Sequence, residues 1–187
     1  MHIKLFVAIP SELPRDVCPE GVELICTGVG KVNAAISATQ HLMHLNPRNT
    51  IVLNYGSAGS AIHPVLSMLT CKKFQQADMD ARPLMQHKGH TPFDDLLYPH
   101  IEKDILVFDD AGALCTTQDT FQQQPEYEVN DMEAYGIAKV CRIFGFDFTA
   151  YKFISDSGDG SDWEENHHLG IEQYLDILNT TWLNSIR

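Results

Sequence analysis

Apolar residues in the first third of the chain alternate between strand-like runs and helix-like spacing. Ile3 to Ile9 is a near-continuous apolar run, which is typical of a strand covered on both faces. Glu23 to Thr27 predicts a second strand, and the turn Gly28-Val29-Gly30 follows it. Apolar residues then recur at helical spacing from Val32 to Met43. Ile51 to Leu53 predicts a third buried strand.

The middle of the chain, from about Ala61 to Asp110, carries weaker patterns because Pro, Gly, His and charged residues interrupt it. Val65 to Phe74 predicts a strand. Leu106 to Phe108 and Ala113 to Thr116 predict two short strands, which turn residues separate.

The last third has clearer periodicity. Ala134 to Cys141 carries an apolar stripe at helical spacing, which Gly145 ends. Phe146 to Ile154 predicts a strand. Ser161 and Glu164 have the spacing of a capping box, and the apolar positions after them predict one long amphipathic helix that reaches Trp182.

Strands that alternate with helices predict an α/β protein with three layers, αβα, around a central sheet that is mostly parallel or mixed. The chain has 187 residues and 44% hydrophobic content. This length suits one sizeable core, so we expect a single domain over residues 1–187.

Charge and composition exclude several classes of partner. The formal net charge of -12 repels phosphate backbones and anionic membrane surfaces, so we expect neither nucleic acid nor a membrane as partner. The five cysteines are scattered without a C-x-x-C pair, which favours a reducing cytoplasm over a disulfide framework. His41 and His44 share a predicted helix face, but no third ligand is evident, so we expect no metal site. No motif calls for a cofactor.

Polar residues follow the predicted strands at four junctions, where α/β proteins usually bind ligands. Glu12 follows the first strand, and Gly56-Ser57-Ala58-Gly59 follows the third. Asp131-Met132-Glu133 opens a helix, and Ser155-Asp156 ends the last strand.

These segments, together with the glycine turn from Thr27 to Ala35, resemble the purine nucleoside phosphorylase superfamily. The resemblance is to its 5′-methylthioadenosine/S-adenosylhomocysteine nucleosidase branch. It covers most of the chain outside Leu84 to Lys103, and its most specific pieces are Asp131 to Ala134 and Ile154 to Asp156. It implies a nucleoside phosphorylase-like fold and an enzyme that cleaves the N-glycosidic bond of a purine nucleoside, of adenine type.

The resemblance implies two catalytic carboxyl groups. Glu12 matches the base that orients and deprotonates the attacking water, whereas its residue type alone would favour a solvated turn residue. Asp156 matches the general acid that protonates N7 of the purine, which requires a carboxyl group that carries a proton in a partly apolar pocket. The other interpretation of Asp156 is a cap for the turn that continues through Asp159.

The resemblance also implies the substrate-binding residues. Glu133 matches the carboxylate that binds the ribose hydroxyls, although Asn130 and Glu133 also have capping-box spacing. Met132 matches the residue packed against the sugar. Phe121 matches the ring that stacks on the purine, whereas by residue type alone a core position would be favoured. The remaining substrate-binding residues are Ser57, Ala58 and Gly59.

Phosphate-using members of the superfamily need arginines beside C1′. This chain has only five arginines, and none lies in the quoted motifs. Hydrolysis is therefore favoured, while a phosphate-dependent phosphorylase and a non-catalytic purine-binding regulatory protein remain as alternatives. A Rossmann-type oxidoreductase would need the full G-x-G-x-x-G fingerprint and a later acidic residue, which are missing.

The chain is shorter than a typical nucleosidase between Asp80 and Leu106. We therefore expect a pocket that is more open or that a second subunit completes. The predicted helix from Val32 to Met43 resembles the interface helices of the nucleosidase branch. Both observations favour a homodimer.

Overall fold

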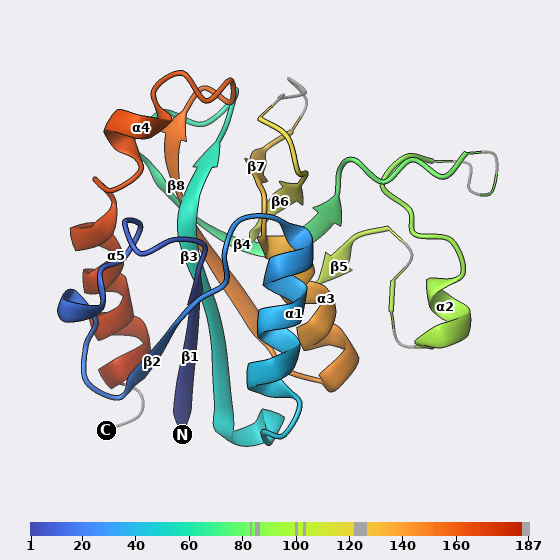
Figure 1. The fold of residues 1–187 in the computed structure, drawn as a ribbon, viewed down its shortest axis with the longest axis horizontal. Helices are drawn as coiled ribbons and strands as arrows, with labels where there is room; N and C mark the ends of the chain where they lie inside the picture. Colours follow the sequence, from blue (N-terminus) through green and yellow to red (C-terminus); the bar gives the residue numbers. More distant parts are fainter. Residues whose placement is uncertain (83, 85–86, 100, 103, 122–126, 185–187) are drawn as a thin grey trace.

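The computed structural model describes residues 1–82, 84, 87–99, 101–102, 104–121 and 127–184 of the chain. Eight strands form one sheet at the centre of the molecule (Figure 1). The strands are β1 His2–Val7, β2 Val22–Cys26, β3 Thr50–Gly59, β4 Met68–Gln76, β5 Leu106–Val107, β6 Ala113–Thr117, β7 Val129–Asp131 and β8 Phe148–Asp156.

The sheet is mixed, and its central strands run parallel. β1 pairs in parallel with β2 and β3, and β3 pairs in parallel with β8 along most of its length. β4 runs antiparallel to β8 and to β5, whereas β6 runs parallel to β4 and to β7. β7 returns to β3 through one antiparallel pair, Gly59 with Asn130, so that β3, β7, β6, β4 and β8 form a closed circuit. The carboxyl ends of β1, β3 and β8 therefore point to one edge.

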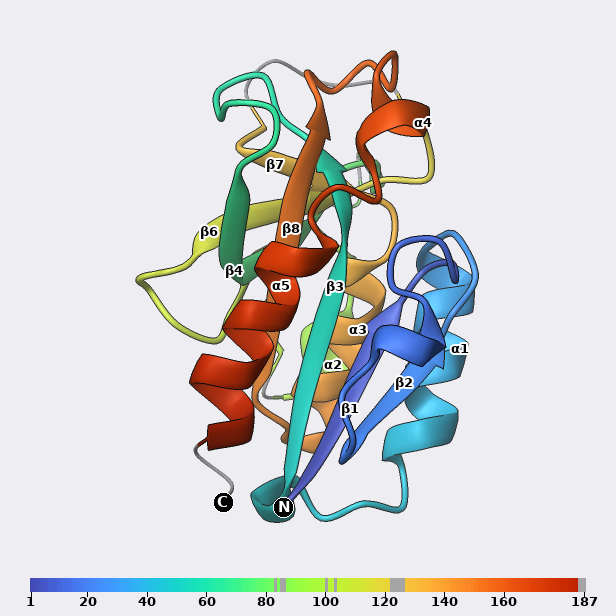
Figure 2. The ribbon, with the colours of Figure 1, turned by 90° about the vertical axis from the view of Figure 1, so that its left-hand side faces the viewer.

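Helices cover both faces of the sheet, which confirms the three-layer α/β fold. α1 (Lys31–Leu42) and α3 (Ala134–Phe144) lie side by side on one face, and α5 (Ile171–Ile177) with the π-helical segment η3 (Leu178–Leu183) lies on the other (Figure 2). Two separate groups of buried apolar side chains fill the spaces between sheet and helices. The short helices are η1 Arg15–Val17, η2 Pro47–Asn49, α2 Asp94–Leu97 and α4 Trp163–Asn166.

Two glycines shape helix α3. Gly145 follows the last turn with a positive φ of 79°, which suits glycine and ends the helix as predicted. A Cβ atom on Gly136 would lie 2.6 Å from the backbone oxygen of Lys31, because α1 and α3 pack closely there. The close contact between the two helices therefore requires glycine, which has no side chain, at position 136.

Several element boundaries differ from the sequence prediction. β3 continues to Gly59, so the segment Gly56 to Gly59 belongs to the strand and does not follow it. The predicted long C-terminal helix is interrupted between α4 and α5. The predicted capping box is also wrong, because the hydroxyl of Ser161 donates to Asp159 and no side chain caps α4. β7 was not predicted at all.

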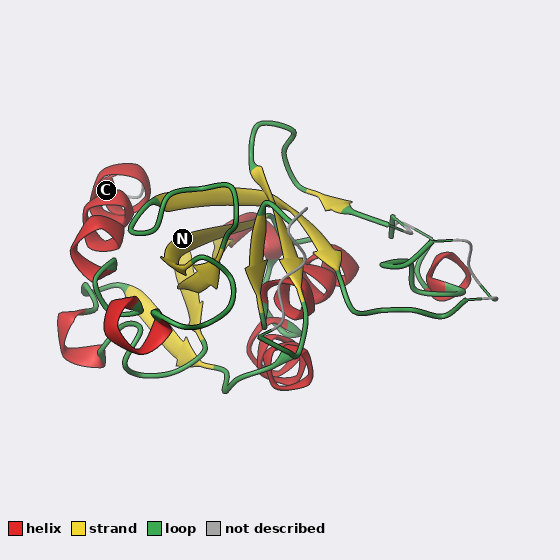
Figure 3. Cartoon of the chain, turned by 90° about the horizontal axis from the view of Figure 1, so that it is seen from above, coloured by secondary structure: helices red, strands yellow, loops and turns green. Residues whose placement is uncertain are grey.

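The described residues between β4 and β5, including α2, extend away from the sheet (Figures 1 and 3). This arm exposes large apolar side chains, among them Phe93, Leu96 and Leu97. Within the described ranges, no helix has the length and apolar character that crossing a membrane requires.

Candidate active site

Glu12 is buried beside β3, although it lies in the turn that follows β1. Its side chain accepts the backbone N–H of Ala8 on Oε2 at 3.0 Å. Its Oε1 accepts both the backbone N–H and the hydroxyl of Ser57, each at 2.9 Å. Gly56 permits this approach, because a Cβ there would lie 3.1 Å from Oε1. With an exposed fraction of 4%, Glu12 is not a solvated turn residue.

Asp156 ends β8 and is also buried, with an exposed fraction of 4%. Its Oδ1 accepts the N–H groups of Gly158 at 2.6 Å and Gly160 at 3.1 Å. Its Oδ2 accepts the hydroxyl of Ser155 at 2.8 Å. The turn-capping interpretation therefore holds for one oxygen. The other oxygen, Oδ2, accepts from the Ser155 hydroxyl, a group that can both donate and accept hydrogen bonds.

Gly59 brings the end of β3 against the turn after Asp156. A Cβ on Gly59 would lie 2.6 Å from the Cα of Gly158 and 2.9 Å from Oδ1 of Asp156. Only a glycine leaves room for this contact. The parallel pairing of β3 with β8 thus places the two strand ends at one site.

The segment Asp131 to Glu133 connects β7 to α3. The predicted capping box between Asn130 and Glu133 does not form, because Glu133 has no capping hydrogen bond there. Asp131 takes that role instead, since its Oδ2 accepts the N–H groups of Glu133 at 3.2 Å and Ala134 at 2.8 Å. Its Oδ1 accepts the hydroxyl of Thr117 at 2.6 Å.

Lys152 lies inside β8 and forms an ion pair with Asp131, with 2.7 Å between Nζ and Oδ2. Both side chains are almost completely buried. Burial alone would raise the pKa of Asp131, but the adjacent Lys152 ammonium and the hydrogen bonds from Thr117 and Ala134 together outweigh burial and lower that pKa. The Asp131 carboxylate in turn keeps the pKa of Lys152 above its usual value despite burial. The pair is therefore ionised at neutral pH.

Glu133 does not cap α3 with its side chain, which contacts the start of α1 instead. Its Oε1 accepts the N–H of Gly30 at 2.9 Å. Burial raises the pKa of Glu133 to about 8, and the negative charge of Asp131 adds to this, while Lys152 opposes it. Gly30 has a φ of 96°, which is a conformation that glycine adopts without strain. The glycine turn is therefore a tight connection between β2 and α1.

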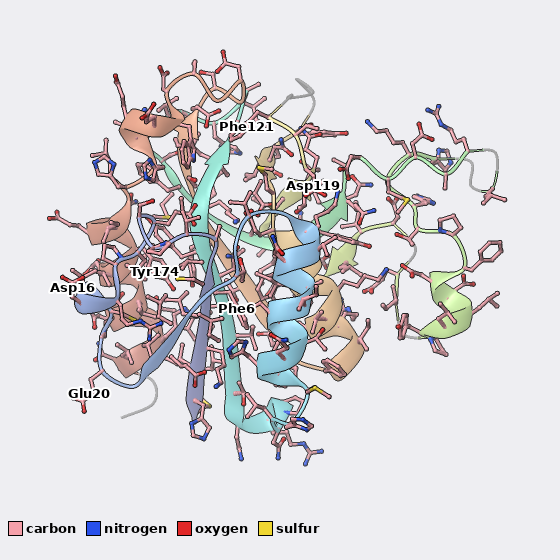
Figure 4. The ribbon with its side chains drawn as sticks, in the orientation of Figure 1. Phe6, Asp16, Glu20, Asp119, Phe121 and Tyr174 are labelled. Carbon is pink, nitrogen blue, oxygen red and sulfur yellow. The ribbon has the colours of Figure 1, made fainter. Side chains whose placement is uncertain are left out.

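Asp119 attaches the Phe121 loop to the same helix end. Its Oδ1 accepts the N–H of Lys31 at 3.0 Å, and its own N–H donates to Asp78. The ammonium of Lys31 contacts both Asp78 and Asp119. Figure 4 shows Asp119 at the start of α1 and Phe121 near the ends of β3 and β8. Phe121 is 58% exposed and is not a core residue.

Glu12, Phe121, Asp131, Glu133 and Asp156 line one cavity of about 320 Å³ at the carboxyl edge of the sheet. Two aromatic rings, Phe121 and Trp163, form part of its wall and meet edge to face with 6.4 Å between centroids. Every substrate-binding and catalytic residue predicted from the sequence lies in its lining. The lining consists of Ala8, Ile9, Glu12, Val29, Ser57, Ala58, Gly59, Thr120, Phe121, Asn130, Asp131, Met132, Glu133, Asp156, Gly158 and Trp163.

Sequence analysis did not name Trp163, which lines the cavity, or Lys152, which pairs with the lining residue Asp131. It quoted Asp131 but did not predict its capping role. A signal existed for Lys152, because it is the only basic residue in the apolar run from Phe146 to Ile154. His41, which we had paired with His44, lies instead against the Ser37 carbonyl at 2.8 Å. Among the described residues, no group of three or more His, Cys, Asp or Glu side chains could hold a metal ion.

Comparison with known proteins agrees with this geometry. The family described as the phosphorylase superfamily matches residues 20–180, and the chain belongs to that superfamily. Within it, the chain falls in the 5′-methylthioadenosine/S-adenosylhomocysteine nucleosidase branch. It is 30% identical to the nucleosidase of Bacillus pumilus over 178 residues, which cover 83% of this chain and 74% of that relative.

Solved structures with the same fold include two enzymes of Helicobacter pylori. The 5′-methylthioadenosine/S-adenosyl homocysteine nucleosidase superimposes with a TM-score of 0.77 at 16% identity, covering 96% of this chain and 97% of that one. The futalosine hydrolase gives a TM-score of 0.77 at 16% identity, with 96% of each chain covered. The nucleoside phosphorylase-like fold is thereby confirmed.

Proposed function

We propose that this protein is an N-glycosyl hydrolase that cleaves a purine nucleoside, of adenine type, to free base and free sugar. In this reaction water adds to C1′ as the C1′–N9 bond breaks, and the bonding electron pair leaves with the purine. Glu12 accepts the proton that the water loses, and Asp156 gives a proton to N7 so that the base leaves neutral. Met132 packs against the sugar, and Glu133 accepts hydrogen bonds from its hydroxyl groups.

The observation that carries this proposal is the presence of two buried carboxyl groups, Glu12 and Asp156, in the wall of one cavity. Burying a carboxyl group is costly unless donors satisfy it, and here backbone N–H groups and serine hydroxyls do so. A protein that only bound purines would not need this pair. The relatives named above are nucleosidases and a futalosine hydrolase, which supports hydrolysis of purine nucleosides here.

We expect turnover to release free base and free sugar without added phosphate. A phosphorylase holds its dianion with arginines, and the described cavity lining contains neither Arg nor Lys. Arg15 follows Glu12 most closely among the arginines of the sequence, and its guanidinium donates to the carbonyl of Leu24. The test is a panel of purine nucleosides incubated with and without phosphate, with chromatography of base, sugar and sugar phosphate. Sugar phosphate as the product, with strict dependence on phosphate, would exclude the hydrolase.

We expect Glu133 to make kcat/KM depend on pH. Its pKa of about 8 means that the free protein holds it neutral below that pH and ionised above it. The ionised form accepts two hydroxyl hydrogen bonds, so kcat/KM should rise as pH passes through about 8 and level off only at pH values above that pKa. Glu133→Gln cannot ionise and serves as the control. The ratio of wild-type to Glu133→Gln kcat/KM should show this rise, and a ratio that is constant with pH would contradict the assignment.

We also propose that the protein is a homodimer. α1 exposes Val32, Ile36 and Met43 to solvent, and the adjacent Val29 is exposed as well. A helix face of this kind is more apolar than a monomer surface usually keeps exposed. Light scattering should give about twice the chain mass of 21.0 kDa. A mass of one chain at micromolar concentration would contradict this proposal.

A cytoplasmic location is our proposal for the compartment. All five cysteines carry free thiols. Cys71, Cys115 and Cys141 are buried, and burial raises the pKa of the Cys115 and Cys141 thiols. Free thiols persist in a reducing compartment. Recovery of the protein in the membrane or extracellular fraction of cells would contradict the proposal.

A further inference from the structure

Trp163, at the start of α4, is connected to Glu12 by a chain of two hydrogen bonds. Its indole Nε1–H donates to the hydroxyl oxygen of Ser57 at 2.9 Å. The Ser57 hydroxyl donates in turn to Oε1 of Glu12 at 2.9 Å. An indole N–H can only donate, so the Ser57 oxygen must accept from it. The single proton of the Ser57 hydroxyl is thereby directed to Glu12.

This chain distinguishes the two oxygens of Glu12. Oε1 receives two donors from Ser57, whereas Oε2 receives the N–H of Ala8. A carboxylate oxygen can accept about two hydrogen bonds, so Oε2 keeps capacity for a further donor. The oxygen that accepts a proton from water is therefore Oε2. The rotation of the Ser57 hydroxyl decides whether Oε1 is saturated.

The position of Trp163 is itself fixed by its neighbours. The indole stacks on the ring of His167, with 4.5 Å between centroids and 16° between planes. The Nε2 atom of His167 lies 3.2 Å from the hydroxyl of Ser11, which directly precedes Glu12. On the cavity side the ring of Phe121 meets Trp163 edge to face. Helix α4 therefore contacts both the turn that carries Glu12 and the strand that carries Ser57.

We propose that Trp163 is a positioning residue for the hydrolytic step, which acts through Ser57 to fix the carboxylate of Glu12. The proposal rests on the proposed function. A positioning role of Trp163 means that water activation depends on the packing of α4 against the cavity. The competing role for Trp163 is that of an apolar wall of the cavity, because its ring also lines the space where substrate binds.

The two roles predict different kinetics. A positioning residue lowers kcat when its N–H is removed, whereas a wall mainly changes KM. Trp163→Phe keeps an aromatic ring but removes the donor. We expect kcat to fall roughly five- to tenfold, the size expected for one lost neutral hydrogen bond, with a smaller change in KM.

The matched control is Trp182→Phe. Trp182 is the only other tryptophan of the chain, and its Nε1–H donates to the hydroxyl of Tyr151 at 2.9 Å, away from the cavity lining. This variant loses an equivalent bond and should keep the wild-type kcat. Thermal melts of both variants show whether they are folded.

A double-mutant cycle with Ser57→Ala tests the route. If Trp163 acts through Ser57, adding Trp163→Phe to Ser57→Ala should lower kcat little further. If the two losses multiply, or if Trp163→Phe matches Trp182→Phe in kcat, the proposal is wrong. Failure of the wild-type protein to release any base would instead contradict the proposed function itself.

An isosteric analogue covers the case in which Trp163→Phe does not fold. In the Trp182→Phe background, position 163 can be filled with benzothienylalanine, in which sulfur replaces the indole N–H. Shape and stacking on His167 are kept, and only the donor is lost. The same fall in kcat is expected. An unchanged kcat would show that the N–H has no positioning role.

Discussion

Asp156→Asn should lower kcat by about 10²–10⁴ on the best substrate, while the thermal unfolding temperature stays close to that of the wild type. The amide cannot transfer a proton to N7, so the purine would leave as an anion. The structure explains why stability should survive. The amide oxygen can still accept the N–H groups of Gly158 and Gly160, and the amide nitrogen can donate to the hydroxyl of Ser155.

The hydroxyl of Ser155 suits a carboxyl group that gains and loses a proton. It donates to Oδ2 of Asp156 at 2.8 Å and lies 3.3 Å from the carbonyl of Ala58. When Oδ2 of Asp156 is protonated, the hydroxyl can turn to donate to the carbonyl of Ala58, and its oxygen can accept a hydrogen bond from Oδ2–H. Both protonation states of Asp156, the proposed general acid, thus keep a hydrogen bond with Ser155.

Two further variants separate catalysis from the turn. Asp156→Ala loses both turn anchors and should also unfold more easily, by about 1–3 kcal/mol. Asp159→Asn is the matched control in the same loop, because Asp159 accepts the N–H and hydroxyl of Ser161. It should leave kcat unchanged. Near wild-type kcat for Asp156→Asn would show that Asp156 is a structural residue only.

The sequence predicted best those elements whose residues are buried locally. Helix α3 has its apolar stripe and its glycine stop in one continuous segment, so both ends were predicted correctly to within about a residue or two. β3 was predicted too short because Gly56, Ser57 and Gly59 have low strand propensity. The pairing with β8 on one side overrides that propensity, and such pairing is not visible in a single segment.

The interruption of the C-terminal helix has a comparable origin. A Cβ on Gly170, the residue before α5, would lie 2.5 Å from the ring of Phe153, so the close approach to β8 there requires a glycine. Apolar periodicity on either side looks the same whether or not the helix continues. The contact with Phe153 involves another element, so the local pattern does not show it.

In the candidate site, too, local sequence patterns could be recognised, whereas contacts between distant segments could not. Glu12, Asp156 and Glu133 could be named from the sequence because they lie at predicted strand ends or at a helix start and match motifs of the resembled family. The hydrogen bond between Trp163 and Ser57 could not be predicted, since the two residues are 106 apart in the chain and meet only in the fold. Lys152 could be recognised as a basic residue within an apolar predicted strand, but the sequence did not indicate that Asp131 is its partner.

The ion pair of Lys152 with Asp131 leads to the prediction with the largest effect on stability. Lys152→Met should lower the free energy of unfolding by about 3–5 kcal/mol, because it leaves the buried carboxylate of Asp131 without a counter-ion. Asp131 also accepts hydrogen bonds from the N–H groups of Glu133 and Ala134, so the segment that we propose to bind the sugar should be disturbed as well. Urea unfolding at neutral pH measures the loss.

Neutral pH suits this measurement because both members of the ion pair stabilise the folded protein there. The raised pKa of Lys152 contributes stability that is present at neutral pH and is lost as pH rises through its value in the folded protein. The lowered pKa of Asp131 contributes stability that is present above the ordinary carboxyl range and is lost as pH falls. Both contributions are present together only between these limits.

Lys72→Met is the matched control, because Lys72 pairs with Asp147, whose side chain is 70% exposed. An exposed pair contributes about 0–1 kcal/mol, so this variant should unfold almost like the wild type. The decisive variant is Lys152→Met combined with Asp131→Asn. It carries no unpaired buried charge, and the amide oxygen can still accept the N–H of Ala134. It should therefore be more stable than Lys152→Met alone, although it contains one more substitution. If its loss equals the sum of the two single losses, the penalty in Lys152→Met comes from lost packing and not from the charge left on Asp131.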